Sequence, residues 1–158
     1  MARQVTLQTI IVRAGKTSSG HDVMEELLVS PEADAWRLLR SPGLVLGTAA
    51  EDIITVDEAR DVRVLRRGGN VAVQLFFTSD GADVKKAALA AFADLDARLD
   101  DESNRQVVFT IPFAVGFEAI EKRVAIVMSS CPGAEWMYGN VYDENQQPLS
   151  WWNESPPR

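Results

Sequence analysis

The chain has 158 residues, enough for one domain with a proper core; 46% are apolar and 25% charged, as is ordinary for a folded protein. No apolar run approaches the roughly 18 residues of a membrane helix, and the N-terminus lacks the long apolar segment of a secretory signal. We therefore expect a cytoplasmic protein that does not bind membranes. The formal net charge of −7 argues against direct binding of nucleic acid and favours a basic partner.

The first part of the chain, residues 1 to 66, predicts short strands. Its apolar residues are β-branched and partly alternate with polar ones, and Pro42 with Gly43 interrupts them. We expect strands in QVTLQTIIVR, DVMEELLVS, AWRLL, EDIITV and ARDVRVLRR. A succession of this kind favours a small, curved, barrel-like sheet.

A β-hairpin is predicted at Gly68-Gly69-Asn70, because these residues tolerate positive φ and valines alternate on both sides of them. The preceding arginines make RRGGN a conceivable anion-binding nest. It lacks the Lys-Ser/Thr ending of a phosphate-binding loop, so we favour the hairpin turn.

The second part, residues 67 to 143, alternates helix and strand. An apolar stripe at spacings of four and three predicts a long helix over residues 79 to 101, through Val84, Ala88, Phe92, Leu95 and Leu99. RQVVFTIP then predicts a strand, VGFEAIEKRVAIVMSS a second helix and EWMYGNVYD a last strand. The whole is an α+β single domain: a strand-rich, barrel-like half joined to a ferredoxin-like α/β sandwich with two helices on one sheet. Residues 144 to 158 are expected to form a loose tail.

Several of these stretches together resemble the bacterial family called domain of unknown function 4265. They are EELLV, AWRLLRSPGLVLGTAAEDIITV, RRGGNVAVQLFF and EWMY, spread over residues 20 to 142. Because that family has no assigned activity, the resemblance implies a fold rather than a function. The layout of the second half is also similar to acidic ribonuclease inhibitors of the RraB type, which join a ferredoxin-like core to an acidic, aromatic end.

Reactive residues are few. The single cysteine, Cys131, and single histidine, His21, exclude an intramolecular disulfide and a zinc site made of these two residue types alone. A nucleophilic pair would need the two to meet, and His21 lies in a polar turn, SSGHD, whereas Cys131 follows a helix. Neighbouring serines and an aspartate in that turn are no catalytic triad, because triad members come from distant segments.

An acidic cluster lies at the end of the predicted first helix. Carboxylates at a helix C-terminus oppose the helix dipole, so stability alone does not favour them. They lack the spacing of a calcium-binding loop, which leaves a solvated face or a docking surface for a basic partner. The residues are Asp94, Asp96, Asp100, Asp101 and Glu102.

The C-terminal stretch GAEWMYGNVYDENQQPLSWW combines carboxylates with aromatic side chains, which are enriched in protein interfaces. For Trp136 and Tyr138 we favour the simpler interpretation, that they cover the sheet. Trp151 and Trp152 must fold back on the domain or contact another chain, so a homodimer is one of the expected possibilities. The candidates for partner binding are Glu135, Trp136, Tyr138, Tyr142, Asp143, Glu144, Trp151 and Trp152.

These observations favour a non-catalytic binding protein without metal or other cofactor. The most concrete form is an immunity protein that neutralises a cognate toxin, since toxic nucleases are basic and an acidic inhibitor mimics phosphate charge. The acidic cluster at the helix end and the acidic residues of the C-terminal stretch would form one negative surface if they lay on the same side of the domain. A regulator of a housekeeping ribonuclease and a small enzyme using scattered carboxylates remain the alternatives.

Overall fold

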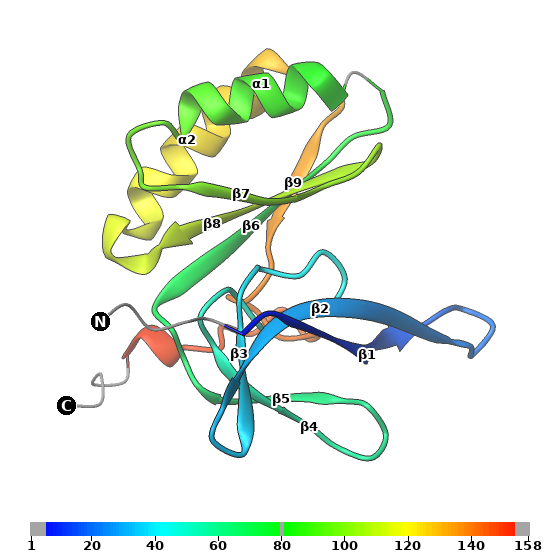
Figure 1. The fold of residues 1–158 in the computed structure, drawn as a ribbon. Coiled ribbons are helices and arrows are strands. Elements are labelled where there is room, and N and C mark those ends of the chain that lie inside the picture. Colours follow the sequence, from blue (N-terminus) through cyan, green and yellow to red (C-terminus); the bar gives the residue numbers. More distant parts are fainter. Residues whose placement is uncertain (1–5, 80, 154–158) are drawn as a thin grey trace.

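The computed structural model of the protein describes residues 6–79 and 81–153, which form two antiparallel sheets and two helices (Figure 1). Within these ranges neither helix is long and apolar enough to cross a membrane. The strands are β1 (Gln8–Lys16), β2 (Asp22–Glu32), β3 (Ala35–Leu38), β4 (Ile53–Val56), β5 (Val62–Arg66), β6 (Asn70–Phe76), β7 (Arg98–Glu102), β8 (Gln106–Pro112) and β9 (Glu135–Tyr138). The helices are α1 (Gly81–Ala91) and α2 (Phe117–Ser130), and two short 3-10 turns are η1 (Phe113–Val115) and η2 (Trp151–Asn153).

The first sheet has the strand order β1-β2-β3-β4-β5, so every predicted strand of the first half forms. Its inner face buries a cluster of aliphatic residues: Val12, Leu27, Val29, Leu38, Val45 and Ile54. The sheet curls until the backbone N–H of Arg13 in β1 donates to the carbonyl of Arg60 before β5, at 2.8 Å. The expected barrel is wrong in one respect: among the described residues the sheet does not close, and β1 and β5 remain its edges.

The second sheet has the order β7-β8-β6-β9, and both helices pack on the same face of it (Figure 1). On β8, Val107, Phe109 and Ile111 are buried toward the helices, as their alternation predicts. On α2 the predicted stripe of Ile120, Val124 and Val127 is buried against them. The other face of the sheet is turned toward the first half of the chain.

The first helix is shorter than predicted. It ends at Ala91, the chain turns with Asp96 in the left-handed region (φ 54°), and residues 98 to 102 form β7 at the edge of the sheet. Leu99, expected on the helical stripe, is paired with Phe109 of β8 instead. A four-residue spacing fits a helix or a turn followed by a strand, and pairing with β8 decides between them.

The hairpin prediction is wrong. β5 pairs with β4, whereas β6 pairs with β8 and β9, so Gly68 and Gly69 carry the chain from one sheet to the other. A Cβ on Gly68 would lie 2.5 Å from the carbonyl carbon of Glu51, and Gly69 has a φ of 84°. The glycines therefore serve a close backbone approach and a left-handed residue rather than a two-residue turn.

Buried polar groups join the two halves. The Asp100 carboxylate in β7 accepts hydrogen bonds from the Ser41 N–H at 2.8 Å and the Thr110 hydroxyl at 2.5 Å, and pairs with Arg98. The side chain of Gln74 in β6 donates to the Pro42 carbonyl at 3.2 Å. The loop that follows β3 is thus held against the outer face of the second sheet.

A second buried carboxylate, that of Asp52, fixes the crossing between the sheets. It accepts hydrogen bonds from the N–H groups of Gly68 at 2.8 Å and Ala49 at 3.0 Å, and lies 3.4 Å from the guanidinium of Arg67. Burial raises the pKa of this carboxyl above its ordinary value, although these hydrogen bonds and Arg67 act in the opposite direction.

The expectation of a loose tail is wrong as far as Asn153. The Asp143 carboxylate accepts hydrogen bonds from the N–H groups of Asn145 and Gln147, which closes a polar turn. The chain then runs back beside Val141, and the Leu149 N–H donates to the Val141 carbonyl at 2.8 Å. Residues 154 to 158, the rest of the expected tail, lie outside the described residues.

Candidate functional site

The fold disperses the acidic cluster that follows α1 in the second half of the chain. Asp94 lies in the turn after α1 and is paired with Arg123 of α2, which lowers the pKa of its carboxyl. Asp100 is buried, and Glu102 is paired with Lys85 at 2.8 Å. Only Asp96 and Asp101 of this cluster are exposed carboxylates without an ion pair among the described residues.

The two predicted halves of a single negative surface do not come together. Asp100 and Asp101 belong to β7 and Glu135 to β9, which are the opposite edges of the four-stranded sheet. Three strand spacings of about 4.8 Å, or roughly 14 Å in all, separate these edges. A partner reaching both would have to span the sheet.

The aromatic residues, in contrast, form one continuous cluster. Edge-to-face contacts connect Trp136 to Tyr138 (4.9 Å between ring centroids), Tyr138 to Phe117 (5.4 Å) and Phe117 to Trp152 (5.0 Å). These side chains come from β9, α2 and η2, so the cluster ties the end of the chain to the helical layer.

The two last tryptophans pack in cis. Trp151 is buried, and its indole N–H donates to the Asn140 carbonyl at 2.8 Å. Its ring lies 5.5 Å from that of Phe113 in an edge-to-face contact, and the guanidinium of Arg67 stands 5.7 Å from the ring centroid. This pair of residues therefore stabilises the fold, and a partner has little of Trp151 to touch.

What remains accessible beside β9 is a surface formed by Glu121, the half-buried Trp136 and the exposed Tyr142, with the buried Tyr138 beneath them; we call these four residues the acidic-aromatic surface. The Tyr138 hydroxyl donates to the Glu121 carboxylate at 3.0 Å, and Tyr142 is 44% exposed. Burial raises the pKa of Tyr138 well above its ordinary value, helped by the Glu121 carboxylate and by Tyr142. Glu135 and Glu144, both exposed, stand next to this surface along the chain.

Glu121 is the residue that sequence analysis missed. It lies on α2, 17 positions before its partner Tyr138, and no local pattern relates the two. Asp143, by comparison, was a candidate whose carboxylate is used inside its own turn.

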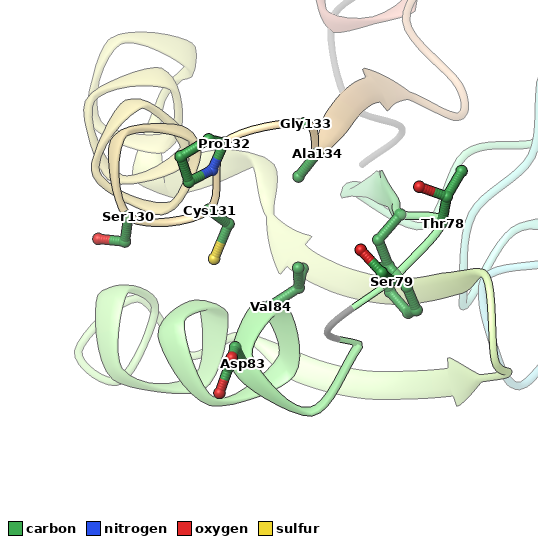
Figure 2. A pocket seen from close by; sticks show the side chains of 10 residues that line it. Thr78, Ser79, Asp83, Val84, Ser130, Cys131, Pro132, Gly133 and Ala134 are labelled. Carbon is green, nitrogen blue, oxygen red and sulfur yellow. The ribbon is translucent and has the colours of Figure 1, made fainter.

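The lone histidine and the lone cysteine are far apart in the fold. His21 is exposed in the turn between β1 and β2, where its backbone N–H donates to the Thr17 hydroxyl at 3.1 Å. Figure 2 shows Cys131 at the end of α2, pointing toward Val84 at the start of α1. The chain therefore does not assemble a cysteine–histidine pair.

A pocket of about 120 Å³ lies between these helix ends and is lined by residues of the second half only, Ser79, Asp83 and Cys131 among them (Figure 2). Pockets for small-molecule ligands commonly measure about 300–1,000 Å³, so this one suits water or a small ion rather than an organic cofactor. A shallower hollow of about 480 Å³ lies at β7 between Arg40, Arg98 and Asp101. In the ranges that the structure describes, no three acidic, histidine or cysteine side chains gather as metal ligands.

Comparison with known proteins extends the fold beyond this chain. A crystal structure of a hypothetical protein from Neisseria gonorrhoeae is similar, with a TM-score of 0.61 and 12% sequence identity, over 88% of this chain and 96% of that one. At that identity the likeness concerns the fold alone. No curated protein matches the sequence.

The family model of the domain of unknown function 4265 matches residues 25–129, about two thirds of the chain. This span runs from β2 to the end of α2 and so contains both sheets' central strands and the loop between them. The protein belongs to the DUF4265 family.

Proposed function

We propose that this protein is a non-catalytic, acidic binding protein, and most concretely an immunity protein that binds and neutralises a basic bacterial toxin domain in the cytoplasm. The observation that carries the proposal is the acidic-aromatic surface beside β9. It combines a hydrogen-bonded tyrosine–carboxylate pair, Tyr138 and Glu121, with an exposed aromatic, Tyr142. The net charge of −7 supports a basic partner.

The composition of this surface suits protein recognition. Trp136 is held rigid by its edge-to-face contact with the buried Tyr138, so a partner can pack on its exposed part at little cost in side-chain entropy. Tyrosine and tryptophan are enriched among the few residues that dominate the binding energy of protein interfaces, while surrounding charges speed the encounter. Glu135 and Glu144 provide those charges.

The proposal includes the assignment of the second half to the ferredoxin-like class. The chain order β6-α1-β7-β8-α2-β9 and the sheet order β7-β8-β6-β9 support it. Such a scaffold places β9 at an edge of the sheet, where the exposed side chains of Glu135 and Met137 can reach a partner.

The test has two stages. The tagged protein and a variant carrying Glu135→Lys, Tyr142→Ala and Glu144→Lys are used to capture partners from the native host, with quantitative mass spectrometry. The captured candidate is then expressed in a laboratory bacterium with either form. We expect a basic protein that only the unmodified chain retains, and growth arrest by that protein that only the unmodified chain relieves.

A matched control variant, Glu26→Lys with Asp34→Ala and Glu58→Lys, changes the net charge by nearly the same amount in the first half of the chain. It should capture and protect like the unmodified protein. Equal loss in both variants would show that overall charge rather than this surface matters, and capture without relief of growth arrest would contradict the immunity role.

A further inference from the structure

β5 is an edge strand whose outer backbone groups are unused. It pairs only with β4, and the hydrogen bond from the Asp57 N–H to the Asp61 carbonyl sets the alternation of that ladder. In an antiparallel pair the residues between hydrogen-bonded ones turn their N–H and C=O groups away from the neighbour. By this alternation Val62 and Val64, which lie opposite Val56 and Ile54, present their peptide groups to the open edge.

The open edge has a definite start. At Arg60, just before β5, the carbonyl is already occupied by the N–H of Arg13 from β1. Within Val62–Arg66, no backbone hydrogen bond other than those to β4 is formed among the described residues. The strand therefore offers two consecutive outward-facing residues, the arrangement to which an added strand binds.

The side chains of this edge are basic and apolar. Arg60, Arg63 and Arg66 are exposed, and within residues 6–79 and 81–153 none of them makes an ion pair. Leu65 is 57% exposed. Three unpaired arginines within seven residues are a local excess of positive charge in a protein whose net charge is −7.

The edges of the second sheet differ. β7 carries Asp100, Asp101 and Glu102, and β9 is only four residues long and begins with Glu135. A second copy of this chain pairing β5 with β5 would bring arginines opposite one another, which destabilises a strand pair. The acidic edge β7 of a second copy is a poor occupant as well, because Asp100 is buried and Glu102 is paired with Lys85. Charge complementarity therefore selects an acidic strand of another protein as the occupant.

We propose that β5 is a docking edge for an extended, acidic peptide segment of another protein, which adds to the first sheet as a sixth strand. The segment hydrogen-bonds to the peptide groups of Val62 and Val64 and places carboxylates against Arg63 and Arg66. This edge lies on the first sheet, away from the acidic-aromatic surface on β9, so the inference stands independently of the immunity role.

The first experiment uses a fluorescein-labelled, strand-length peptide in which valine alternates with glutamate, titrated with the full-length protein while anisotropy is measured. A peptide alternating valine with lysine is its counterpart. We expect the glutamate peptide to bind and the lysine peptide to fail. The double variant R63E/R66E should weaken binding about tenfold or more, because two attractive charge pairs become repulsive.

Two controls separate this site from general charge and from misfolding. The variant K86E/R105E makes the same change in net charge at two exposed, unpaired side chains of the second half, and should bind like the unmodified protein. Val64→Pro removes one outward N–H without breaking the ladder to β4, and should abolish binding. If that variant does not fold, a peptide methylated at alternate backbone nitrogens tests the same hydrogen bonds from the other side.

Nuclear magnetic resonance locates the contact, since the amide signals of Val62 and Val64 should shift on addition of the glutamate peptide. Equal weakening by R63E/R66E and K86E/R105E would overturn the proposal, as would binding that survives Val64→Pro or backbone methylation. Single-stranded DNA that binds in an R63E/R66E-sensitive manner where the peptide does not would also overturn it, in favour of a nucleic-acid site.

Discussion

Replacing Trp151 tests whether the end of the chain is part of the folded structure. Trp151→Ala removes a buried indole, its hydrogen bond to the Asn140 carbonyl at 2.8 Å, and its contacts with Phe113, Trp152 and Arg67. Emptying such a site costs about 3–5 kcal/mol. Trp151→Phe keeps most of the packing but lacks the N–H donor, so it should cost about 1–2 kcal/mol.

The measurement is urea unfolding followed by circular dichroism, because the substitution itself changes tryptophan fluorescence. Small domains have only about 5–15 kcal/mol of stability, so Trp151→Phe keeps the test readable if the alanine variant is unfolded. Leu89→Ala, at a side chain 45% exposed on α1, is the control and should change stability by less than about 0.5 kcal/mol. A Trp151→Ala protein as stable as this control would refute the inference that the tail is anchored through Trp151.

Three further predictions concern the crossing glycines, the tyrosine pair and the lone reactive residues. Gly68→Ala should destabilise the protein by about 1–3 kcal/mol, because the added Cβ would collide with the Glu51 backbone. At Gly69 an added Cβ meets nothing within 4 Å, so Gly69→Ala should cost about 1 kcal/mol through its positive φ alone. Equal melting temperatures for the two variants would contradict this. In a Tyr142→Phe protein Tyr138 is the remaining tyrosine, and ultraviolet titration should show that its pKa lies well above the ordinary value. Adding Glu121→Gln should lower that pKa, because a neutral amide no longer opposes the phenolate. An unchanged titration would show that the Glu121 carboxylate has no influence. Replacing His21 and Cys131 together by alanine should leave the biological activity, measured as relief of growth arrest, essentially intact. Loss of that activity in a double variant that still folds and still captures the partner would contradict the non-catalytic account.

Local sequence patterns correctly predicted those elements that can be recognised without knowing what packs against them. The alternation of Val107, Phe109 and Ile111 and the stripe of Ile120, Val124 and Val127 appear in the structure as the buried faces of β8 and α2. In both cases the apolar period is set by the element itself, so it can be read without knowing what covers it.

The errors arose where a pattern has two physical readings. Gly68-Gly69 satisfies a hairpin turn, but a close approach to Glu51 and a left-handed residue need glycine just as much. The spacing of Leu95 and Leu99 fits a helix, yet Leu99 gains a strand partner in Phe109 that the sequence cannot reveal. In each case a long-range contact decides.

The candidate site shows the same limit at the level of single side chains. Asp100 and Asp101 are neighbours of identical chemistry, but one is buried among Ser41, Thr110 and Arg98 and the other is exposed. A bulge between Leu99 and Asp101 sets which side each faces, and composition does not encode it. The sequence could therefore name acidic and aromatic candidates, but only the fold separates structural members from accessible ones.

The measurement that tests the central proposal most directly is the kinetics of association with the captured partner over a range of salt concentrations. Glu135→Lys with Glu144→Lys should slow association and flatten its salt dependence while leaving dissociation nearly unchanged, because exposed charges steer the encounter. Tyr142→Ala should do the reverse and speed dissociation about tenfold or more, as expected of an aromatic contact at the centre of an interface. Association that is independent of salt, together with unchanged dissociation of the Tyr142→Ala protein, would show that the acidic-aromatic surface is only a solvated face.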